Sequence, residues 1–299
     1  MIGFLKKMTK KKSKTYKIND SCIYKLTTKR RLLEVLSLNQ KTLQELLKQG
    51  DNNYSVKDQE GRICQTPKGR YKKISLFKIH KKIDSLLSSI ETPEYLFSGK
   101  KGKSCLDNAK FHLENCNKTI VKLDIRKFFP SIKFSHILDF FQNTMQCNYD
   151  VATILTTLST YNNHLPTGSP LSGRLSYFAH KKMFDDISEE AQKQNCKVSV
   201  WADDIVISGN NAQKVGWTAK TIIHKRGLKY HQGKFKIYLP SDNKEITGII
   251  ITSEGRIDLR NRSRKKIYDL KNKKDKTPEE IASLKGCINE AKLILGIEI

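Results

Sequence analysis

Residues 198–208 have the sequence VSVWADDIVIS, in which apolar residues alternate around the acidic pair Asp203 and Asp204. This pattern predicts a β-hairpin with two carboxylates at its tip. Residues 119–123 (TIVKL) are apolar and β-branched, and predict a strand that leads into Asp124. Adjacent acids repel each other, and a carboxylate at the end of an apolar strand is costly to bury, so a neutralising group is expected beside them.

A pair of divalent cations would neutralise these acids. Hard Mg²⁺ takes carboxylate oxygens and substrate phosphates together, and two ions about 3.5–4 Å apart stabilise both oxygens of a phosphoryl transfer. An Asp-Asp pair in a hairpin is by itself also explained by an exposed polar turn. The metal hypothesis gains support from the surrounding sequence, because Asp203 follows Asp124 by 79 residues, with a Gly-Ser-Pro turn at 168–170 between them and a basic helix after them.

The composition favours a polyanionic partner. The chain has 299 residues, with 56 Lys and Arg against 30 Asp and Glu, which gives a formal net charge of +26. That excess exceeds what solubility requires and favours nucleic acid over a membrane surface. The length suggests about two domains or one multi-lobed domain, and 37% apolar residues exclude a wholly disordered chain.

The cysteines and the apolar runs predict a cytoplasmic protein. The seven cysteines are odd in number and contain no CxxC pair, which favours reduced thiols over disulfides or a structural zinc site. No apolar run approaches the ~18 residues of a membrane span, and lysines follow the short apolar start instead of preceding it. We therefore expect neither membrane insertion nor secretion.

Hydrophobic periodicity predicts an alternation of helices and strands. The predicted helices are two short ones between Lys29 and Gln49, then Ile74–Ile90, Ser135–Gln142, Asp150–Tyr161, Leu171–Gln194, Lys214–Arg226 and a helical segment after Arg260 with a break at Thr277-Pro278. The predicted strands are a pair within Tyr54–Gln65, then Thr119–Leu123, the hairpin Val198–Ser208, Lys236–Leu239 and Ile246–Thr252. This order predicts an α+β protein.

Seven motifs, in order, resemble those of reverse transcriptases, and within them the retron type. They are RICQTP (62–67) with the helix after it, NAKFH (108–112), LDIRKFFPSI (123–132), LPTGSPLS (165–172), WADD (201–204), the segment 227–235 with its lysine, and ITG (246–248). The resemblance covers about residues 54–270. Trp201 replaces the family's usual Tyr, Thr167 its Gln, and Phe235 the Thr after Lys234.

The resemblance implies a right-hand polymerase fold with fingers, a palm built from an antiparallel sheet with helices on one face, and a small helical thumb. The expected domains are a basic arm and helices at 1–53, fingers at 54–118, palm at 119–252 and a basic helical thumb at 253–299. The lysines at the start, from Lys6 to Lys17, form either an arm that orders on phosphate or a solvated tail.

The resemblance also implies roles at the reaction site. Asp124 and Asp203 would hold two Mg²⁺ ions, with Mn²⁺ as the alternative; Ile125 would offer its carbonyl, and Asp204 would support them. Phe129 would exclude a ribose 2′-hydroxyl, because only one of Phe128 and Phe129 can face substrate before Pro130. The implied nucleotide contacts also include Arg62, Thr167 and Gly168. Lys234 would protonate the departing pyrophosphate. The alternative for Arg62 is a solvated strand residue without a role in binding. The alternative for Lys234 is a charge that faces phosphate without transferring a proton.

The motifs shared with the retron type imply RNA contacts as well. Asn108 and His112 share one helix face and would either contact RNA or brace the palm. Thr247 and Gly248, read as part of a strand, would contact a template RNA stem. Cations of the thumb would follow the phosphates of the duplex; they are Arg256, Arg260, Arg262, Arg264, Lys265 and Lys266.

The implied function is RNA-directed DNA synthesis. The expected partners are a structured noncoding RNA template, its branched RNA-linked DNA product and deoxynucleoside triphosphates, in a bacterial antiphage system with a separate effector protein. The alternatives are another bacterial defence or intron-like reverse transcriptase, or an RNA-binding scaffold with a relict palm.

Overall fold

The computed structural model describes residues 15–59 and 61–296. The predicted basic arm up to Lys14 lies outside the described residues. Contacts divide the chain into two compact units: the first contains the described residues up to Thr92 together with Lys133–Leu175, and the second contains Pro93–Ile132 and the residues from Ser176 onward. The four predicted domains remain a prediction.

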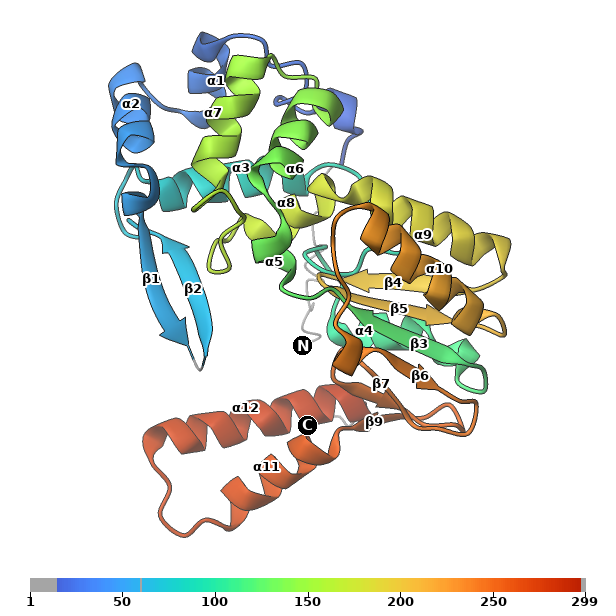
Figure 1. Cartoon of the computed structure of the whole chain (residues 1–299). Helices are drawn as coiled ribbons and strands as arrows, with labels where there is room; N and C mark the ends of the chain where they lie inside the picture. Colours follow the sequence, from blue (N-terminus) through green and yellow to red (C-terminus); the bar gives the residue numbers. More distant parts are fainter. Residues whose placement is uncertain (1–14, 60, 297–299) are drawn as a thin grey trace, which may run out of the picture. The chain divides into compact units, whose positions relative to one another are not determined.

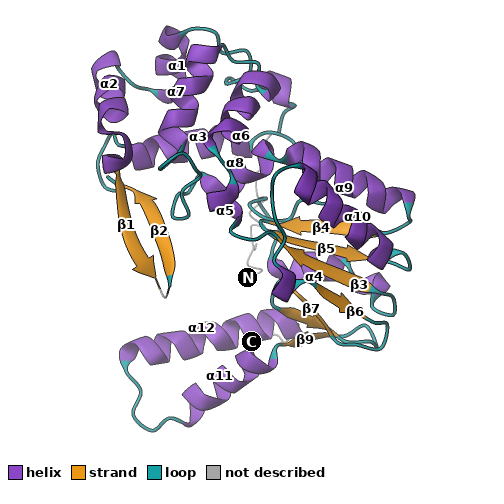
Figure 2. Cartoon of the chain, viewed as in Figure 1, coloured by secondary structure: helices purple, strands orange, loops and turns teal. Residues whose placement is uncertain are grey.

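The first unit is a helical bundle with one hairpin (Figures 1 and 2). Its helices are α1 (Lys29–Leu36), α2 (Gln40–Gln49), α3 (Leu76–Ser88), α6 (Phe134–Asp139) and α7 (Tyr149–Ser159), with short 3₁₀ turns at Ile18–Asp20 and Gly50–Asn53 and a π-helical turn at Phe140–Thr144. Thr28, Asn39 and Ser75 cap α1, α2 and α3 by accepting a hydrogen bond from a first-turn amide. The two short helices and the long one after them are confirmed.

The hairpin of the first unit consists of β1 (Tyr54–Gln59) and β2 (Arg62–Pro67), which pair antiparallel from Tyr54–Pro67 to Gln59–Arg62. This is the predicted strand pair. At its base, the buried Tyr54 donates a hydrogen bond to the carbonyl of Thr160 after α7.

A four-stranded antiparallel sheet is the centre of the second unit. Its strands are β3 (Ile120–Asp124), β4 (Lys197–Trp201), β5 (Asp204–Ser208) and β6 (Lys236–Tyr238), in the order β4-β5-β3-β6. Helices α9 (Lys181–Lys193) and α10 (Ala212–Lys225) contact the sheet side by side (Figure 1). The approach of α10 is close, because a Cβ at Gly216 would lie 2.8 Å from Val121 Cγ1.

The predicted helix Leu171–Gln194 is wrong as a single element. It is two helices, α8 (Ser172–Ala179) and α9, separated at His180. The His180 carbonyl accepts hydrogen bonds from Met183 and Phe184 and so starts α9 afresh. Its ring packs 6.4 Å from the ring of Phe128, which ties the junction to the segment after β3.

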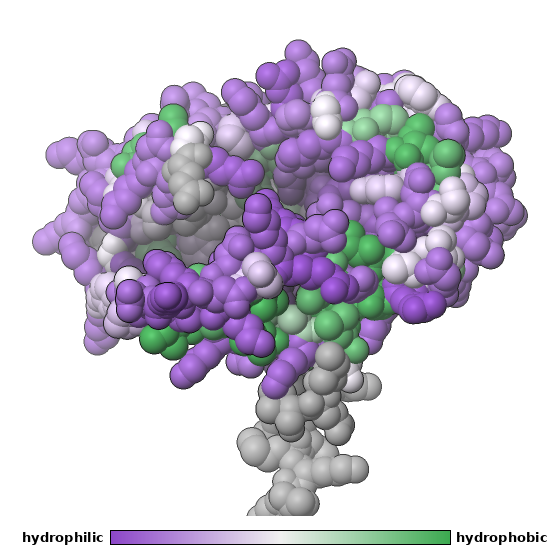
Figure 3. Space-filling model, turned by 90° about the horizontal axis from the view of Figure 1, so that it is seen from below, coloured by the Kyte–Doolittle hydropathy of each residue, from purple (hydrophilic) through white to green (hydrophobic). Residues whose placement is uncertain are grey.

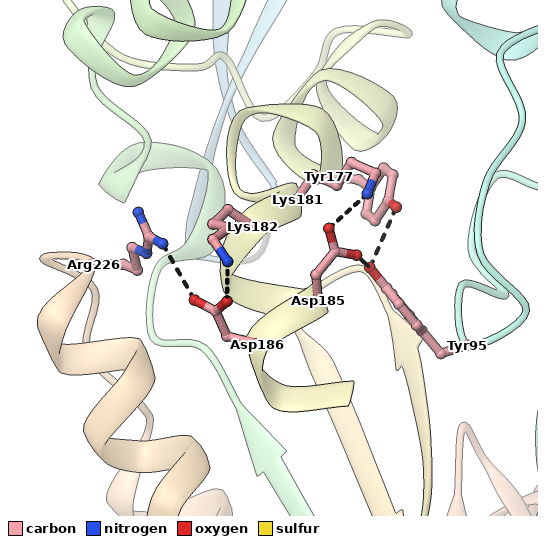
Figure 4. Close-up of polar contacts among 7 residues, drawn as sticks. All are labelled: Tyr95, Tyr177, Lys181, Lys182, Asp185, Asp186 and Arg226. Atoms are coloured by element: carbon pink, nitrogen blue, oxygen red, sulfur yellow. Dashed lines mark hydrogen bonds and ion pairs between the residues drawn. The ribbon is translucent and has the colours of Figure 1, made fainter. Parts of the chain in front are cut away.

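Helix α9 is held by two carboxylates that point to different neighbours (Figure 4). Asp185 accepts hydrogen bonds from Tyr95 and Lys181, at 2.5 and 2.6 Å. Asp186 pairs with Lys182 at 2.7 Å and with Arg226, after the end of α10, at 3.3 Å. The adjacent acids therefore fasten α9 to the segment around Tyr95 and to the end of α10.

The other face of the sheet is partly covered by a second apolar core. It involves α4 (Cys105–Phe111), a three-stranded sheet of β7 (Lys244–Ile246), β8 (Ile249–Ile251) and β9 (Ile257–Leu259), and helix α12 (Pro278–Leu295). Its buried members are Ala109, Ile120, Val206, Ile246, Ile249, Ile251, Leu259 and Ile294. The remaining elements are α5 (Phe128–Ser131), α11 (Asn261–Asn272) and the 3₁₀ turns Leu113–Asn115 and Gln232–Lys234.

The predicted strand Ile246–Thr252 is also wrong as a single element, although β8 lies within it. Ile246 pairs with Ile249, so Thr247 and Gly248 form a two-residue turn between β7 and β8. Both have positive φ, 44° and 84°, as such a hairpin turn requires. Just before the turn, the Lys244 side chain is fully buried and donates to the carbonyls of Pro240 and Asp242.

The surface is consistent with the composition. In the space-filling view most of the visible residues are hydrophilic, and the hydrophobic areas are small and separate (Figure 3). Within residues 15–59 and 61–296, no helix has the length and apolar character needed to cross a membrane. All seven cysteines are free.

Candidate active site

The turn between β4 and β5 carries the acidic pair. Trp201 pairs with Asp204, which leaves Ala202 and Asp203 as a two-residue turn. Ala202 has a φ of 56°, which is unusual for a residue with a Cβ, and its amide donates to Ser98 Oγ at 3.0 Å. The predicted hairpin is thus confirmed, with Asp203 in the turn and Asp204 opening β5.

Backbone pairing brings Asp124 to the same edge of the sheet. Asp124 ends β3 opposite Asp204, and the amide of the next residue, Ile125, donates to the carbonyl of Asp203 at 2.9 Å. Directly opposed residues of an antiparallel pair lie on the same face. The three acids predicted from the sequence are therefore neighbours, and Asp124 is only 5% exposed.

The carboxylates are crowded with negative charge. Burial raises the pKa of Asp203, and the charges of Asp124 and Asp204 raise it further. Burial also raises the pKa of Asp204, opposed by Lys122, whose Nζ lies 3.4 Å from Asp204 Oδ2. Burial and mutual repulsion therefore disfavour the charged carboxylates more than the neighbouring lysines favour them.

Lys234 supplies one counter-charge. Its Nζ donates to Asp124 Oδ2 at 2.6 Å, and this hydrogen bond raises the pKa of Lys234. The side chain is half exposed, so it reaches the carboxylates from the solvent side.

The donor set suits hard divalent cations, because it consists of carboxylate oxygens with neighbouring backbone carbonyls. In the described part of the chain, no three His, Cys, Asp or Glu side chains already surround a common point. The lysines Lys122 and Lys234 contact Asp204 and Asp124 instead. The raised pKa values of Asp203 and Asp204 are the observation that fits cation binding, since a cation would stabilise both charged forms.

The segment that carries Lys234 is fastened to the strand end. His231 donates its amide to the carbonyl of Asp124 at 2.7 Å, and Arg126 donates to the carbonyl of Lys229 at 2.8 Å. Tyr230 pairs with Ile125. These bonds fix the backbone on both sides of the metal-ligand candidates.

Sequence reasoning missed Lys220, which holds the same segment from α10. Its Nζ lies 3.3, 3.7 and 4.7 Å from the ring centroids of Phe235, Trp217 and Tyr230, and the residue is 7% exposed. Such contacts stabilise a cation by about 0.5–2 kcal/mol each. The available signal was Phe235, where the family pattern has Thr.

The two aromatic residues after Asp124 separate as predicted. Phe128 is buried and packs against Phe184 and His180, whereas Phe129 is half-buried. The ring of Phe129 is therefore the one that can face a substrate.

The turn of the 165–172 motif docks on β2 within the first unit. The Thr167 hydroxyl donates to the carbonyl of Ile63 at 2.7 Å and lies 2.8 Å from Gln65 Oε1. The Gly168 amide donates to the carbonyl of Gln65, and a Cβ at Gly168 would lie 2.4 Å from Thr66 Oγ1. Glycine is thus required at 168, and the Thr167 hydroxyl is directed to the strand. Arg62, at the start of β2, is exposed.

For Asn108 and His112 the structure contradicts direct RNA contact, because both side chains are fully buried. The His112 ring nitrogens lie 2.7 Å from Ser208 Oγ and 2.8 Å from Ser199 Oγ, and burial lowers the pKa of His112 to about 3. Asn108 donates to Thr247 Oγ1 at 3.4 Å. Helical spacing puts both residues on one face, and that face points inward, so bracing of the palm is the interpretation that fits.

The remaining RNA-binding candidates are partly correct in position. Thr247 and Gly248 form the turn described above, with the Arg260 guanidinium packed over Gly248 and within 3.5 Å of Glu245. Arg256 precedes β9 and Arg260 directly precedes α11, so neither lies on a thumb helix as predicted. Arg264 and Lys265 do lie on α11, and Arg264 pairs with Asp258.

An antiparallel sheet with helices on one face, and with three carboxylates gathered where β3 and the β4–β5 hairpin end, is the palm of a template-dependent nucleic-acid polymerase. The chain belongs to the reverse transcriptase (RNA-dependent DNA polymerase) family, whose model matches residues 9–251. The predicted α+β right-hand polymerase fold is confirmed.

Curated relatives support the retron resemblance. The chain is 33% identical over 142 residues to the retron Se72 reverse transcriptase of Salmonella heidelberg (strain 579083-10), a match that covers 46% of this chain and 36% of the relative. It is 26% identical over 173 residues to the retron Ec86 reverse transcriptase of Escherichia coli, covering 57% of this chain and 53% of the relative. The chain thus spans about a third to a half of these relatives.

Solved structures agree on the fold. A telomerase from Candida albicans, in complex with a fragment of telomeric RNA, superposes with a TM-score of 0.51 at 10% identity, over 73% of this chain and 49% of that one. A telomerase from Candida tropicalis gives a TM-score of 0.52 at 9% identity, over 70% and 54%.

Proposed function

We propose that this chain is an RNA-directed DNA polymerase of a bacterial retron system. It would copy a structured noncoding RNA into single-stranded, branched RNA-linked DNA in antiphage defence, together with a separate effector protein. The observation that carries the proposal is the cluster of Asp124, Asp203 and Asp204 at one sheet edge, in a chain similar to retron reverse transcriptases.

The reaction requires attack of a hydroxyl oxygen on the α-phosphorus of a deoxynucleoside triphosphate, with pyrophosphate as the leaving group. Asp124 and Asp203 would hold two Mg²⁺ ions, aided by the Ile125 carbonyl and supported by Asp204. Bound ions would stabilise the negative charge on the attacking and leaving oxygens. Mn²⁺ is the alternative ion.

The protein side chains have separate tasks in this scheme. Lys234 would give a proton to the departing pyrophosphate. Phe129 would exclude a ribose 2′-hydroxyl by its bulk, and Arg62 would contact the triphosphate through its planar guanidinium. Thr167 and Gly168 would support the nucleotide indirectly, by holding their turn on β2, because the Thr167 hydroxyl and both backbone amides already bond to Ile63 and Gln65.

RNA contacts are expected on the exposed cations of the second unit. Arg256, Arg264 and Lys265 would meet phosphates, and the Thr247–Gly248 turn with Arg260 would approach an RNA stem. Asn108 and His112 would contribute by holding that turn and the sheet in position.

The test is expression of the chain with its flanking noncoding DNA, followed by extraction of nucleic acid, RNase treatment and a denaturing gel. We expect a short, homogeneous single-stranded DNA that is absent in the Asp203→Asn/Asp204→Asn variant. Incorporation of nucleotides only on an added primed RNA would instead identify a reverse transcriptase of another kind. Tight RNA binding without any incorporation would identify the relict scaffold.

A further inference from the structure

The outer edge of the palm sheet is covered at one residue of β4 and open two residues earlier. β4 is an edge strand. The Val200 amide donates to the Tyr95 carbonyl at 2.8 Å, and the Val200 carbonyl accepts from the Phe97 amide at 3.0 Å. Hydrogen-bonded and non-hydrogen-bonded pairs alternate along an antiparallel ladder, so the amide and carbonyl of Val198 point to this same outer edge.

Both backbone groups of Val198 lack a hydrogen-bond partner. Among residues 15–59 and 61–296, no backbone or side-chain group bonds to its amide or its carbonyl, although the residue is only 6% exposed. Backbone groups in such buried positions are almost always paired. The strand therefore offers one donor and one acceptor, side by side, to a group from outside the fold.

A concavity lies beside this open edge. The segment that covers Val200 turns away from the strand, because the Leu96 amide donates to the Pro93 carbonyl at 3.3 Å. The space left between this turn, α9 and the start of β4 has a volume of about 480 Å³, and its walls include Tyr95 and Phe111. All of these residues belong to the second unit. The open backbone groups of Val198 thus line a space large enough for several side chains.

The unpaired charges of the concavity are acidic. Glu94 and Glu189 line it and are exposed, and neither forms an ion pair within the described part of the chain. The three lysines of its walls are already engaged, in the ion pairs Lys181–Asp185, Lys182–Asp186 and Lys197–Glu114 (the first two are drawn in Figure 4). In a chain with a net charge of +26, this place therefore repels phosphate and attracts a cation.

Strand alternation decides where an added side chain would point. Lys197 faces α4, because its Nζ lies 4.9 Å from the centre of the Phe111 ring. Val198 therefore faces the opposite side, where α9 packs on β4. Directly opposed residues of an antiparallel pair share a face. A residue paired with Val198 would thus direct its side chain toward α9, which carries Glu189, and its two neighbours would lie on the side of Phe111.

We propose that the open edge of β4 and its concavity bind an extended, cationic segment of a partner protein. One residue of that segment pairs with Val198 in antiparallel fashion, accepting a hydrogen bond from its amide and donating one to its carbonyl. The side chain of this residue is an arginine or a lysine, which meets Glu189 and Glu94, and its neighbours are apolar. This is strand addition to a free sheet edge, and it does not involve the carboxylates of the active site.

The test uses the peptide acetyl-GTVRVTG-amide, titrated into the full chain labelled with isotopic valine and followed by nuclear magnetic resonance. We expect a saturable shift of the Val198 amide signal, whereas that of Val121 on β3 stays in place. A peptide with N-methylarginine keeps the charge and loses the donor to the Val198 carbonyl, and it should bind about 2- to 12-fold more weakly, the range of one hydrogen bond. Replacing the arginine by glutamate should abolish the shift.

Variants of the chain test the charge. Glu94→Gln/Glu189→Gln should weaken binding by about 2- to 30-fold, the range of two lost solvent-exposed ion pairs. The matched control is Glu45→Gln/Glu279→Gln, which removes the same charge from exposed positions outside the concavity and should leave the affinity unchanged.

Three results would overturn the proposal. They are the absence of a saturable Val198 shift at millimolar peptide, equal affinity of the N-methylated peptide, and an equal loss in the control variant. The titration contains neither metal ions nor nucleotides. Its failure would therefore leave the proposed polymerase untouched, and failure of DNA synthesis would leave this binding site untouched.

Discussion

The two ends of the acidic face of the palm sheet solve the problem of buried polar groups in opposite ways. At one end, Asp124 and Asp204 lie opposite each other beside Asp203, and burial raises the pKa of the last two. At the other end, Ser199 and Ser208 hold the His112 ring from both sides. Along β3, only three residues lie between Ile120, opposite Ser208, and Asp124, opposite Asp204. The comparison teaches that one sheet face can hold mutually repelling carboxylates at one end while the buried polar groups at its other end are fully hydrogen-bonded.

The sharpest test of this comparison is Asp203→Asn. Nucleotide incorporation should fall by at least about 10³-fold, because loss of a single group aimed at transition-state charge already costs 10²–10³. The melting temperature should stay the same or rise, since the substitution removes a partly buried charge next to Asp124 and Asp204. Primer extension and calorimetry measure the two effects, and a marked fall in melting temperature would contradict the contrast.

At the satisfied end, His112→Ala should lower the free energy of unfolding by about 3 kcal/mol. It removes the imidazole partner of two buried serine hydroxyls, of which only that of Ser208 keeps another partner, Asn115, and it opens a cavity. Urea unfolding measures the loss. A triple variant, His112→Leu/Ser199→Ala/Ser208→Ala, should recover part of it, because the ring and both hydroxyls are then replaced by apolar groups, whereas Asn115 loses its bond to Ser208 Oγ and keeps only the Ser208 carbonyl as acceptor. Equal destabilisation of both variants would argue against the hydrogen-bond explanation.

The buried histidines, His112 at this end of the sheet and His80 in the first unit, make the fold sensitive to acid. Burial lowers the pKa of His112 to about 3 and that of His80, in the first unit, to about 4. The unfolded chain therefore binds more protons than the native one below the ordinary value of 6.5, and stability falls as the pH decreases from there. The expected slope is about 1 kcal/mol per pH unit for each histidine. Denaturant titrations between pH 6.5 and 5 measure it, and a flat profile would exclude neutral buried rings.

Midway between the two ends, Lys122→Met should have the smallest effect. Lys122 Nζ lies 3.4 Å from Asp204 Oδ2, longer than a strong charge-assisted hydrogen bond, and both side chains keep about one-fifth of their surface in solvent, so we expect the pair to contribute about 1 kcal/mol. We expect a loss of about two- to fivefold in nucleotide incorporation and little change in melting temperature. Lys197→Met, at the far end of the same face, is the control and should leave incorporation unchanged.

The sequence predicted the acidic end of the sheet face better than the end where His112 bonds to Ser199 and Ser208, for a physical reason. Strand alternation and a turn fix where Asp203 and Asp204 must lie, because local pairing alone brings them to the hairpin tip. The spacing of Asn108 and His112 indicates a shared helix face, but only tertiary packing decides whether that face points inward.

Two predicted elements were wrong for the same reason: hydrophobic periodicity does not reveal a local change of backbone conformation inside an apolar run. An apolar run such as residues 246–252 resembles one strand, although Thr247 and Gly248 have the positive φ values of a turn. Residues 171–194 resemble one helix, although His180 leaves the helical conformation, with a φ of −119° and a ψ of 18°. The cation–aromatic contacts of Lys220 were equally invisible, since Trp217, Tyr230 and Phe235 meet only after α10 has packed on the sheet.

The fully enclosed Lys244 has a practical consequence. An amine-reactive label in brief exposure modifies the many solvent-facing lysines at once, whereas Lys244 reacts only after the β7–β8 hairpin has opened. Its rate of modification, followed by mass spectrometry, therefore measures how often the three-stranded sheet β7-β8-β9 opens locally. Slower modification of Lys244 in the presence of an RNA stem would show that the bound RNA suppresses opening of the hairpin that carries the Thr247–Gly248 turn.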